Sequence, residues 1–183
     1  MESTCGTCGK PLESFETIHV AGVGPRCYRC FNRETAQRLG IDFDEPRFQP
    51  VLVEDAEGTP HTFTIRSMLV PTGLEIEAVE RVDEGRAGYR FAVLGDFETD
   101  AWALFQRLCA NMRREMSIRH LHRTEFGWQL TSDQRLVGRI ESDPDSDLRL
   151  PLLVIDGKAF TWQEVGHMLM TFEYTIDVVS DSE

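Results

Sequence analysis

Four of the five cysteines stand in two Cys-x-x-Cys pairs, and no other residues of the chain have a spacing so suited to chemistry. Cys5 and Cys8 form the first pair, and Cys27 and Cys30 form the second after 18 intervening residues. Zinc takes four soft ligands in a tetrahedron, which two such turns supply when they come together. The spacing therefore predicts one Zn²⁺ bound by these cysteines. Four thiolates leave no open coordination position, so we expect the metal to be structural.

The residues around the pairs predict the elements that position the sulfur atoms. Gly6 and Gly9 permit the tight turn of a zinc knuckle. Residues 15–25 predict a small hairpin, and the second pair runs into a helix over 31–40 that ends at Gly40. A knuckle, a hairpin and two ligands at the start of a helix resemble the treble-clef or zinc-ribbon family over residues 5–40. The resemblance implies a small module that zinc stabilises.

Two other uses of the cysteines stay open, namely redox or disulfide chemistry and an iron–sulfur cluster. A redox Cys-x-x-Cys normally occurs once, on a thioredoxin-like βαβ unit, and no such unit is predicted. Disulfides need an oxidising compartment, whereas the sequence has no secretory signal. It also lacks an apolar run of about 18 residues, so no transmembrane helix is expected. We expect a bacterial or archaeal cytoplasmic protein.

Arginines near the second pair are candidates for contact with a partner. Arg26, Arg29 and Arg33 are spaced to share one face of the helix and its entry. They could meet phosphates, dock on an acidic surface, or simply be solvated. A second basic segment, with weaker claims to a phosphate site, contains Arg113, Arg114 and Arg119.

Charge is divided unevenly along the chain. The 183 residues include 31 acidic and 19 basic ones, for a formal net charge of −12. Residues 1–50 carry 6 basic and 7 acidic side chains, and residues 51–183 carry 13 and 24. Such a protein repels a phosphate backbone, which argues against general coating of nucleic acid. An apolar content of 41% is enough for a core and excludes a wholly disordered chain.

Past residue 50 the apolar periodicity is mostly two, which is typical of strands. Strands are expected over 48–54, 61–70, 74–82, 89–94, 127–130, 135–141, 152–155 and 173–179. Helices are expected over 98–120 and, from a capping box at 161–164, over 161–171. We predict an α+β fold in which a treble-clef-like module over 1–41 is joined by a linker over 42–50 to a domain over 51–179. That domain is a mostly antiparallel sheet with two helices, and 180–183 is a frayed tail.

Residues 150–158, 162–164 and 168–173 resemble the C-terminal part of uncharacterised bacterial proteins that pair an N-terminal zinc ribbon with an α+β domain. The resemblance implies a bacterial origin and no particular activity. None of the common hydrolase, zinc-protease or kinase motifs occurs in the sequence. We therefore expect a non-enzymatic interaction or adaptor protein whose acidic domain contacts a protein partner or a second copy of itself. The alternative is a nucleic-acid-associated factor that binds through Arg26, Arg29 and Arg33.

Overall fold

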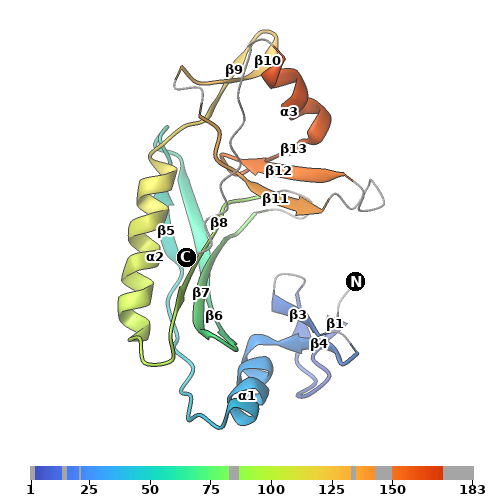
Figure 1. Ribbon diagram of the computed structural model, residues 1–183, viewed down its shortest axis with the longest axis vertical. Helices are drawn as coiled ribbons and strands as arrows, with labels where there is room; N and C mark the ends of the chain where they lie inside the picture. Colours follow the sequence, from blue (N-terminus) through green and yellow to red (C-terminus); the bar gives the residue numbers. More distant parts are fainter. Residues whose placement is uncertain are drawn as a thin grey trace. The chain divides into compact units, whose positions relative to one another are not determined.

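The computed structural model describes residues 3–13, 16–20, 22–82, 87–132, 135–142 and 150–170. Within them the protein is α+β, with three helices and strands that all pair antiparallel. The chain divides into two compact units, one of residues 1–81 with 90–117 and one of residues 82–89 with 118–183. Each unit has its own strands and at least one helix (Figure 1).

The first unit combines the cysteine-containing segment with a four-stranded sheet. Its elements are β1 (Ser3–Thr4), β2 (Pro11–Leu12), β3 (Thr17–Val20), β4 (Gly24–Cys27), α1 (Tyr28–Leu39), β5 (Val51–Glu54), β6 (Pro60–Val70), β7 (Gly73–Glu80), β8 (Arg90–Gly95) and α2 (Ala101–Met116). β1 pairs with β2, β3 pairs with β4, and the large sheet has the order β5-β6-β7-β8.

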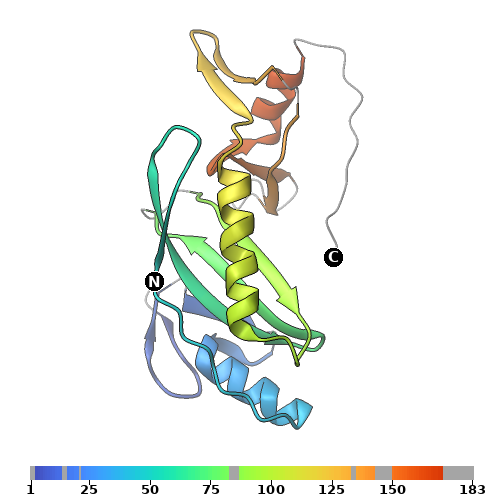
Figure 2. The ribbon, with the colours of Figure 1, turned by 90° about the vertical axis from the view of Figure 1, so that its left-hand side faces the viewer.

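Alternation along β6 decides which face of the sheet is buried. Phe63 is fully buried and Leu69 is nearly so, whereas Thr64 and Arg66 on the opposite face are only half-buried. The helix α2 lies across the buried face (Figure 2). Its side chains Leu104, Leu108, Met112 and Met116, which recur at helical spacing, fill the core of the unit.

The predicted helix over 98–120 forms, but it is shorter at both ends. Asp100 accepts a hydrogen bond from the backbone N–H of Ala103 and so begins α2 at Ala101. Ser117 ends the helix. The side-chain cap thus sets a boundary that apolar periodicity alone placed three residues too early.

The second unit contains short hairpins and one helix. Its elements are β9 (Leu121–Thr124), β10 (Gly127–Leu130), β11 (Arg139–Ser142), β12 (Pro151–Ile155), β13 (Lys158–Thr161) and α3 (Trp162–Leu169). β9 pairs with β10, and β11-β12-β13 form a three-stranded sheet. Leu121, Leu153, Ile155, Phe160 and Val165 are buried together as its core. The expected capping box is present, because Thr161 and Glu164 each bond the other's backbone N–H.

The strands after the linker do not form the single sheet that was expected. They divide into a four-stranded sheet covered by α2 and, in the second unit, a three-stranded sheet and a separate hairpin. The cause is that each group pairs with its sequence neighbours and buries its apolar face under its own helix. The compact units also differ from the predicted division, since residues 51–179 contribute to both units. The strand expected at 173–179 and the tail at 180–183 lie outside the described residues.

Candidate metal centre

The structure gathers the four predicted cysteines into one cluster. The sulfur atoms of Cys5, Cys8, Cys27 and Cys30 all lie within 4.8 Å of one another. The first pair stands on the turn between β1 and β2, while Cys27 ends β4 and Cys30 lies in the first turn of α1. Ligands from the two ends of a 26-residue segment thus meet at a single point.

Backbone hydrogen bonds shape the turn that carries the first pair. The N–H of Cys5 donates to the Lys10 carbonyl at 2.9 Å, and the N–H of Gly9 donates to the Cys5 carbonyl at 2.8 Å. Gly9 has a φ of +72°, in the left-handed region that favours glycine. At Gly6 the constraint is different, because a Cβ there would lie 2.5 Å from the guanidinium of Arg26, which would have to shift.

Backbone N–H groups also point at the sulfur atoms. The N–H of Cys27 donates to Cys5 Sγ, and the N–H of Cys30 donates to Cys27 Sγ, both at 3.4 Å. Burial raises the pKa of the Cys5 thiol, but the N–H groups of Cys27, Cys8 and Thr7 outweigh burial and lower that pKa to about 6. Burial and the neighbouring thiols raise the pKa of Cys30 to about 12. Cys5 therefore loses its proton readily, whereas a cation is needed for all four cysteines to be thiolates at once.

The donor set and its spacing fit a metal ion with four thiolate ligands. Sulfur atoms at the corners of a tetrahedron with metal–sulfur bonds of about 2.3 Å lie about 3.8 Å apart. The Cys8 and Cys27 sulfurs are 3.9 Å apart. All five cysteines are free thiols, and this separation is far beyond a disulfide bond of about 2.05 Å. Cys5, Cys8, Cys27 and Cys30 can hold one metal ion.

Of the three arginines near the second pair, Arg26 points inward. It lies on β4, is only 9% exposed, and donates to the carbonyl of Pro25 at 3.1 Å. It also forms an ion pair with Glu34 at 3.4 Å. Arg26 therefore belongs to the interior of the module and does not share an open face with Arg29 and Arg33, both of which are exposed on α1.

The second set of predicted arginines is divided between α2 and the second unit. Arg113 and Arg114 are exposed in the last turn of α2, where Arg114 pairs with Glu115 at 3.0 Å. Arg119 belongs to the second unit and donates to the Leu121 carbonyl at 2.6 Å. The three arginines therefore do not form one basic surface within a single unit.

Asn32 fastens the cysteine-bearing helix to the sheet, a role that no sequence pattern indicated. Asn32 follows Cys30 by two positions on α1 and is 1% exposed. Its amide nitrogen donates to the carbonyl of Ser67 on β6, and its amide oxygen accepts from the N–H of Leu69, both at 2.9 Å. The same nitrogen donates to Glu45 at 2.9 Å. The position of α1 against β6 thus depends on a residue two positions from Cys30 of the cysteine cluster.

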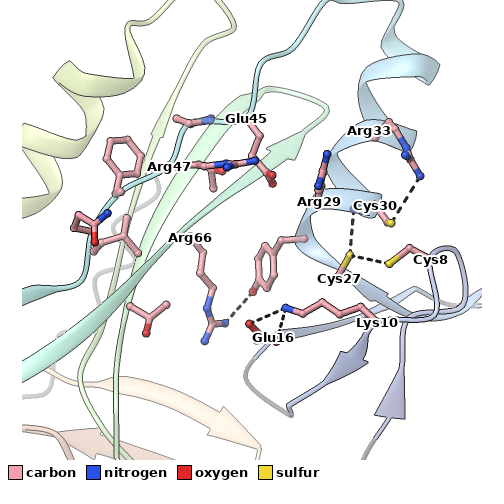
Figure 3. A pocket seen from close by; sticks show the side chains of 17 residues that line it. Cys8, Lys10, Glu16, Cys27, Arg29, Cys30, Arg33, Glu45, Arg47 and Arg66 are labelled. Atoms are coloured by element: carbon pink, nitrogen blue, oxygen red, sulfur yellow. Dashed lines mark hydrogen bonds and ion pairs between the residues drawn. The ribbon is translucent and has the colours of Figure 1, made fainter.

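A groove of about 890 Å³ opens beside the cluster (Figure 3). Its walls come from the cysteine module, from α1, from residues 45–49 before β5, and from residues 64–67 of β6. Arg29, Arg47 and Arg66 line it from three different elements. Arg66 donates to the Tyr28 hydroxyl at 2.9 Å and stacks over the Tyr28 ring. Arg47 and Arg66 were not candidates in the sequence, because only folding brings them beside α1.

A second titratable cluster links β6 and β7 to the turn after β5 in the first unit. The His61 ring bonds Glu80 through Nδ1 at 2.6 Å and Asp55 through Nε2 at 3.1 Å. Burial lowers the pKa of His61, but the two carboxylates outweigh burial and raise that pKa above 6.5. The arrangement joins the turn after β5 to β6 and β7, and we interpret it as a structural brace.

Comparisons with known families divide the chain in a similar way. A family described as a domain of unknown function, DUF7686, matches residues 44–117, and another, DUF7713, matches residues 120–174. The interval between the two matches coincides with the division of the compact units near residue 117. The cysteine cluster lies outside both matches. Searches of curated proteins and of solved structures found no match.

No helix in the described part of the chain combines the length and the apolar composition that a membrane crossing requires.

Proposed function

We propose that this chain is a zinc-stabilised interaction protein, in which one structural Zn²⁺ bound by Cys5, Cys8, Cys27 and Cys30 holds α1 in place for binding a protein partner. The observation that carries the proposal is that Cys30 and Asn32 stand close together in the sequence of α1. A metal ligand and the anchor to β6 stand two residues apart on one helix. A metal that fixes Cys30 therefore also fixes the surface that α1 presents.

The order of elements supports a treble-clef arrangement for this module. A knuckle turn carries Cys5 and Cys8, the hairpin β3–β4 follows, and α1 begins at the second pair. Zinc is the metal we assign, because a closed set of four thiolates in a structural site is typical of Zn²⁺. The four-cysteine set leaves the metal no open position for a substrate, which favours a binding role over a catalytic one.

The test uses the tagged full chain recovered from the cells that naturally produce it, with and without nuclease treatment. We expect a discrete protein to co-purify, to survive nuclease treatment, and to bind the zinc-loaded chain again when both are purified. Binding should weaken at least about tenfold when Cys30→Ser removes one ligand. Recovery of nucleic acid without a protein, or equal binding by the Cys30→Ser variant, would contradict the proposal.

The exposed arginines of α1 support a second candidate, a nucleic-acid-associated factor. Arg29 and Arg33 are exposed, and both line the groove. Binding of this kind weakens steeply as salt is raised, because phosphate contacts release counterions. A titration of single-stranded and duplex DNA at two salt concentrations, repeated with Arg29→Glu, tests it. Partner binding that is insensitive to salt would exclude this candidate.

A further inference from the structure

The open edge of β6 in the groove has the properties of a binding site for a peptide strand. We propose that an extended acidic segment of a partner protein adds to β6 as an extra antiparallel or parallel strand, with its carboxylates against the groove arginines. The inference rests on the proposed function and deepens it by naming the site and the chemistry of the partner.

One edge of β6 is only partly covered. On one side, β7 pairs with residues 63–70 of β6. On the other side, β5 pairs only with residues 60–63. Among the described residues, no strand therefore pairs with the second edge of β6 over residues 64–70. Uncovered strand edges of this kind are templates for pairing with another chain.

The hydrogen-bond pattern shows which backbone groups point at this edge. The backbone carbonyl of Thr62 faces β7, because it accepts a hydrogen bond at 2.8 Å from the N–H of Arg81, the residue after β7. Backbone groups of successive residues alternate between the two edges of a strand, so those of Ile65, Ser67 and Leu69 point to the open edge. The contacts of Asn32 agree, because its side chain meets Ser67 and Leu69.

Asn32 forms hydrogen bonds with only some of the backbone groups at that edge. It takes the carbonyl of Ser67 and the N–H of Leu69. The N–H and carbonyl of Ile65 and the N–H of Ser67 have no hydrogen-bond partner in the described part of the chain. Ile65 and Ser67 both line the groove. An added strand would supply the missing partners, with the side chain of Asn32 marking where it ends.

Residues 45–49, which precede β5, do not pair with the open edge of β6, and contacts of this segment explain why. Pairing of β5 with β6 begins only at Val51, which lies opposite Phe63. Phe48 stacks on Phe105 of α2 with ring centroids 4.5 Å apart. That contact ties the segment to α2, and the segment becomes the far wall of the groove instead of a continuation of β5. The volume of about 890 Å³ lies in the range of about 300–1,000 Å³ that is usual for ligand pockets.

The charged side chains that line the groove favour an acidic ligand. Five basic side chains line the groove against the two acidic ones of Glu16 and Glu45. Lys10 already pairs with Glu16 at 3.0 Å, and Arg33 donates to Cys30 Sγ at 3.8 Å, where it offsets thiolate charge. Arg29 and Arg47 are exposed and have no partner among the residues that the structure describes. Both arginines can form ion pairs with carboxylates of a bound peptide.

A short peptide suits these features better than a nucleic acid. The chain as a whole carries −12, and a long polyanion would feel that charge along its length. A peptide with a few carboxylates responds mainly to charges within a Debye length of about 8–10 Å, where the groove is basic. A peptide also has the alternating N–H and carbonyl groups that Ile65 and Ser67 require.

The test pans a phage-displayed library of random dodecapeptides on the full zinc-loaded chain. We expect the selected peptides to be enriched in Asp and Glu over the unselected library. A synthetic selected peptide should bind at least about tenfold more weakly to Arg29→Glu/Arg47→Glu. The matched control is Arg38→Glu/Arg113→Glu, which changes charge equally at exposed arginines outside the groove and should bind normally. Zinc content is measured for each variant.

Backbone pairing has its own readout. N-methylation of alternate amides of the selected peptide should abolish binding for one alternate set and leave it unchanged for the other, because only one edge of the peptide meets β6. Neutral or basic selected peptides, or equal effects of both methylated sets, would overturn the inference. Peptides that ignore Arg29→Glu/Arg47→Glu would also overturn it, while leaving protein binding as the function. Binding of a dT12 oligonucleotide with no peptide selected would overturn both.

Discussion

The side-chain amide of Asn32 occupies a position along β6 that the backbone of a neighbouring strand would otherwise take. One amide supplies a donor and an acceptor to the carbonyl of Ser67 and the N–H of Leu69. Because both partners are buried, they lose a hydrogen bond that water cannot replace if the amide is removed. Asn32 thus links the cysteine-bearing helix to the large sheet.

Replacement of Asn32 by Ala should lower the free energy of unfolding by about 2–3 kcal/mol, because it leaves buried backbone groups unpaired. The measurement is chemical denaturation of the zinc-loaded protein. Gln37→Ala, an exposed position on the same helix, is the matched control and should change stability by less than about 0.5 kcal/mol. Equal effects of the two substitutions would show that Asn32 does not anchor α1.

His61 predicts a dependence of stability on pH. Its pKa is raised above 6.5 in the folded state, so the charged ring stabilises the fold fully below pH 6.5. That contribution is lost as the pH rises through the folded pKa. The difference in unfolding free energy between wild type and His61→Gln should therefore shrink as the pH is raised from about 6.5 into the alkaline range. A difference that is constant over this range would show that the ring is not charged between Asp55 and Glu80.

The residues that sequence reasoning identified are those whose chemistry is local. The spacing of the Cys-x-x-Cys pairs is itself the evidence for a metal ligand set, and the cluster forms as expected. Asn32 and Arg47 acquire their roles only through contacts with segments far away in the sequence, so no local pattern marks them. Arg26 fits the helical spacing of Arg29 and Arg33, but it lies on β4 and is buried against the knuckle.

At the scale of elements, short-range signals placed the helices and hairpins well. The dipeptide Asp156-Gly157 predicts a hairpin, and both residues have the positive φ values, +48° and +69°, that this turn requires. The Asp156 carboxylate also accepts the N–H groups of His120 at 3.0 Å and Leu121 at 2.9 Å. The number of sheets was not predictable in this way, because it depends on which helix covers each group of strands.

Asp156 therefore has two separable roles. Asp156→Ala should lower the free energy of unfolding of the second unit by about 2–4 kcal/mol, because it strains a left-handed turn and leaves two N–H groups unpaired. Asp156→Asn keeps the turn and one acceptor oxygen, so it should lose less than half as much. Hydrogen exchange in β12 and β13 is the measurement. Equal losses in the two variants would show that the charge of Asp156, and not the turn, is what matters.

Each of the two units of the molecule has its own core, and the four clustered cysteines all lie in the first unit. The proposed Zn²⁺ would supply folding free energy to a module this small. Chelation should therefore accelerate hydrogen exchange in residues 3–13 and 22–40 and around residues 65–69 of β6. Exchange in β9, β10, β12 and β13 should stay unchanged. Acceleration spread equally over both units would contradict a structural role confined to the first.

Native mass spectrometry, recorded together with a denatured spectrum of the same sample, tests whether Cys5, Cys8, Cys27 and Cys30 hold one structural Zn²⁺. We predict one zinc per chain in the native spectrum. The denatured mass should correspond to all cysteines as free thiols. A metal-free native mass, with a denatured mass lowered by the hydrogens lost on disulfide formation, would contradict the account.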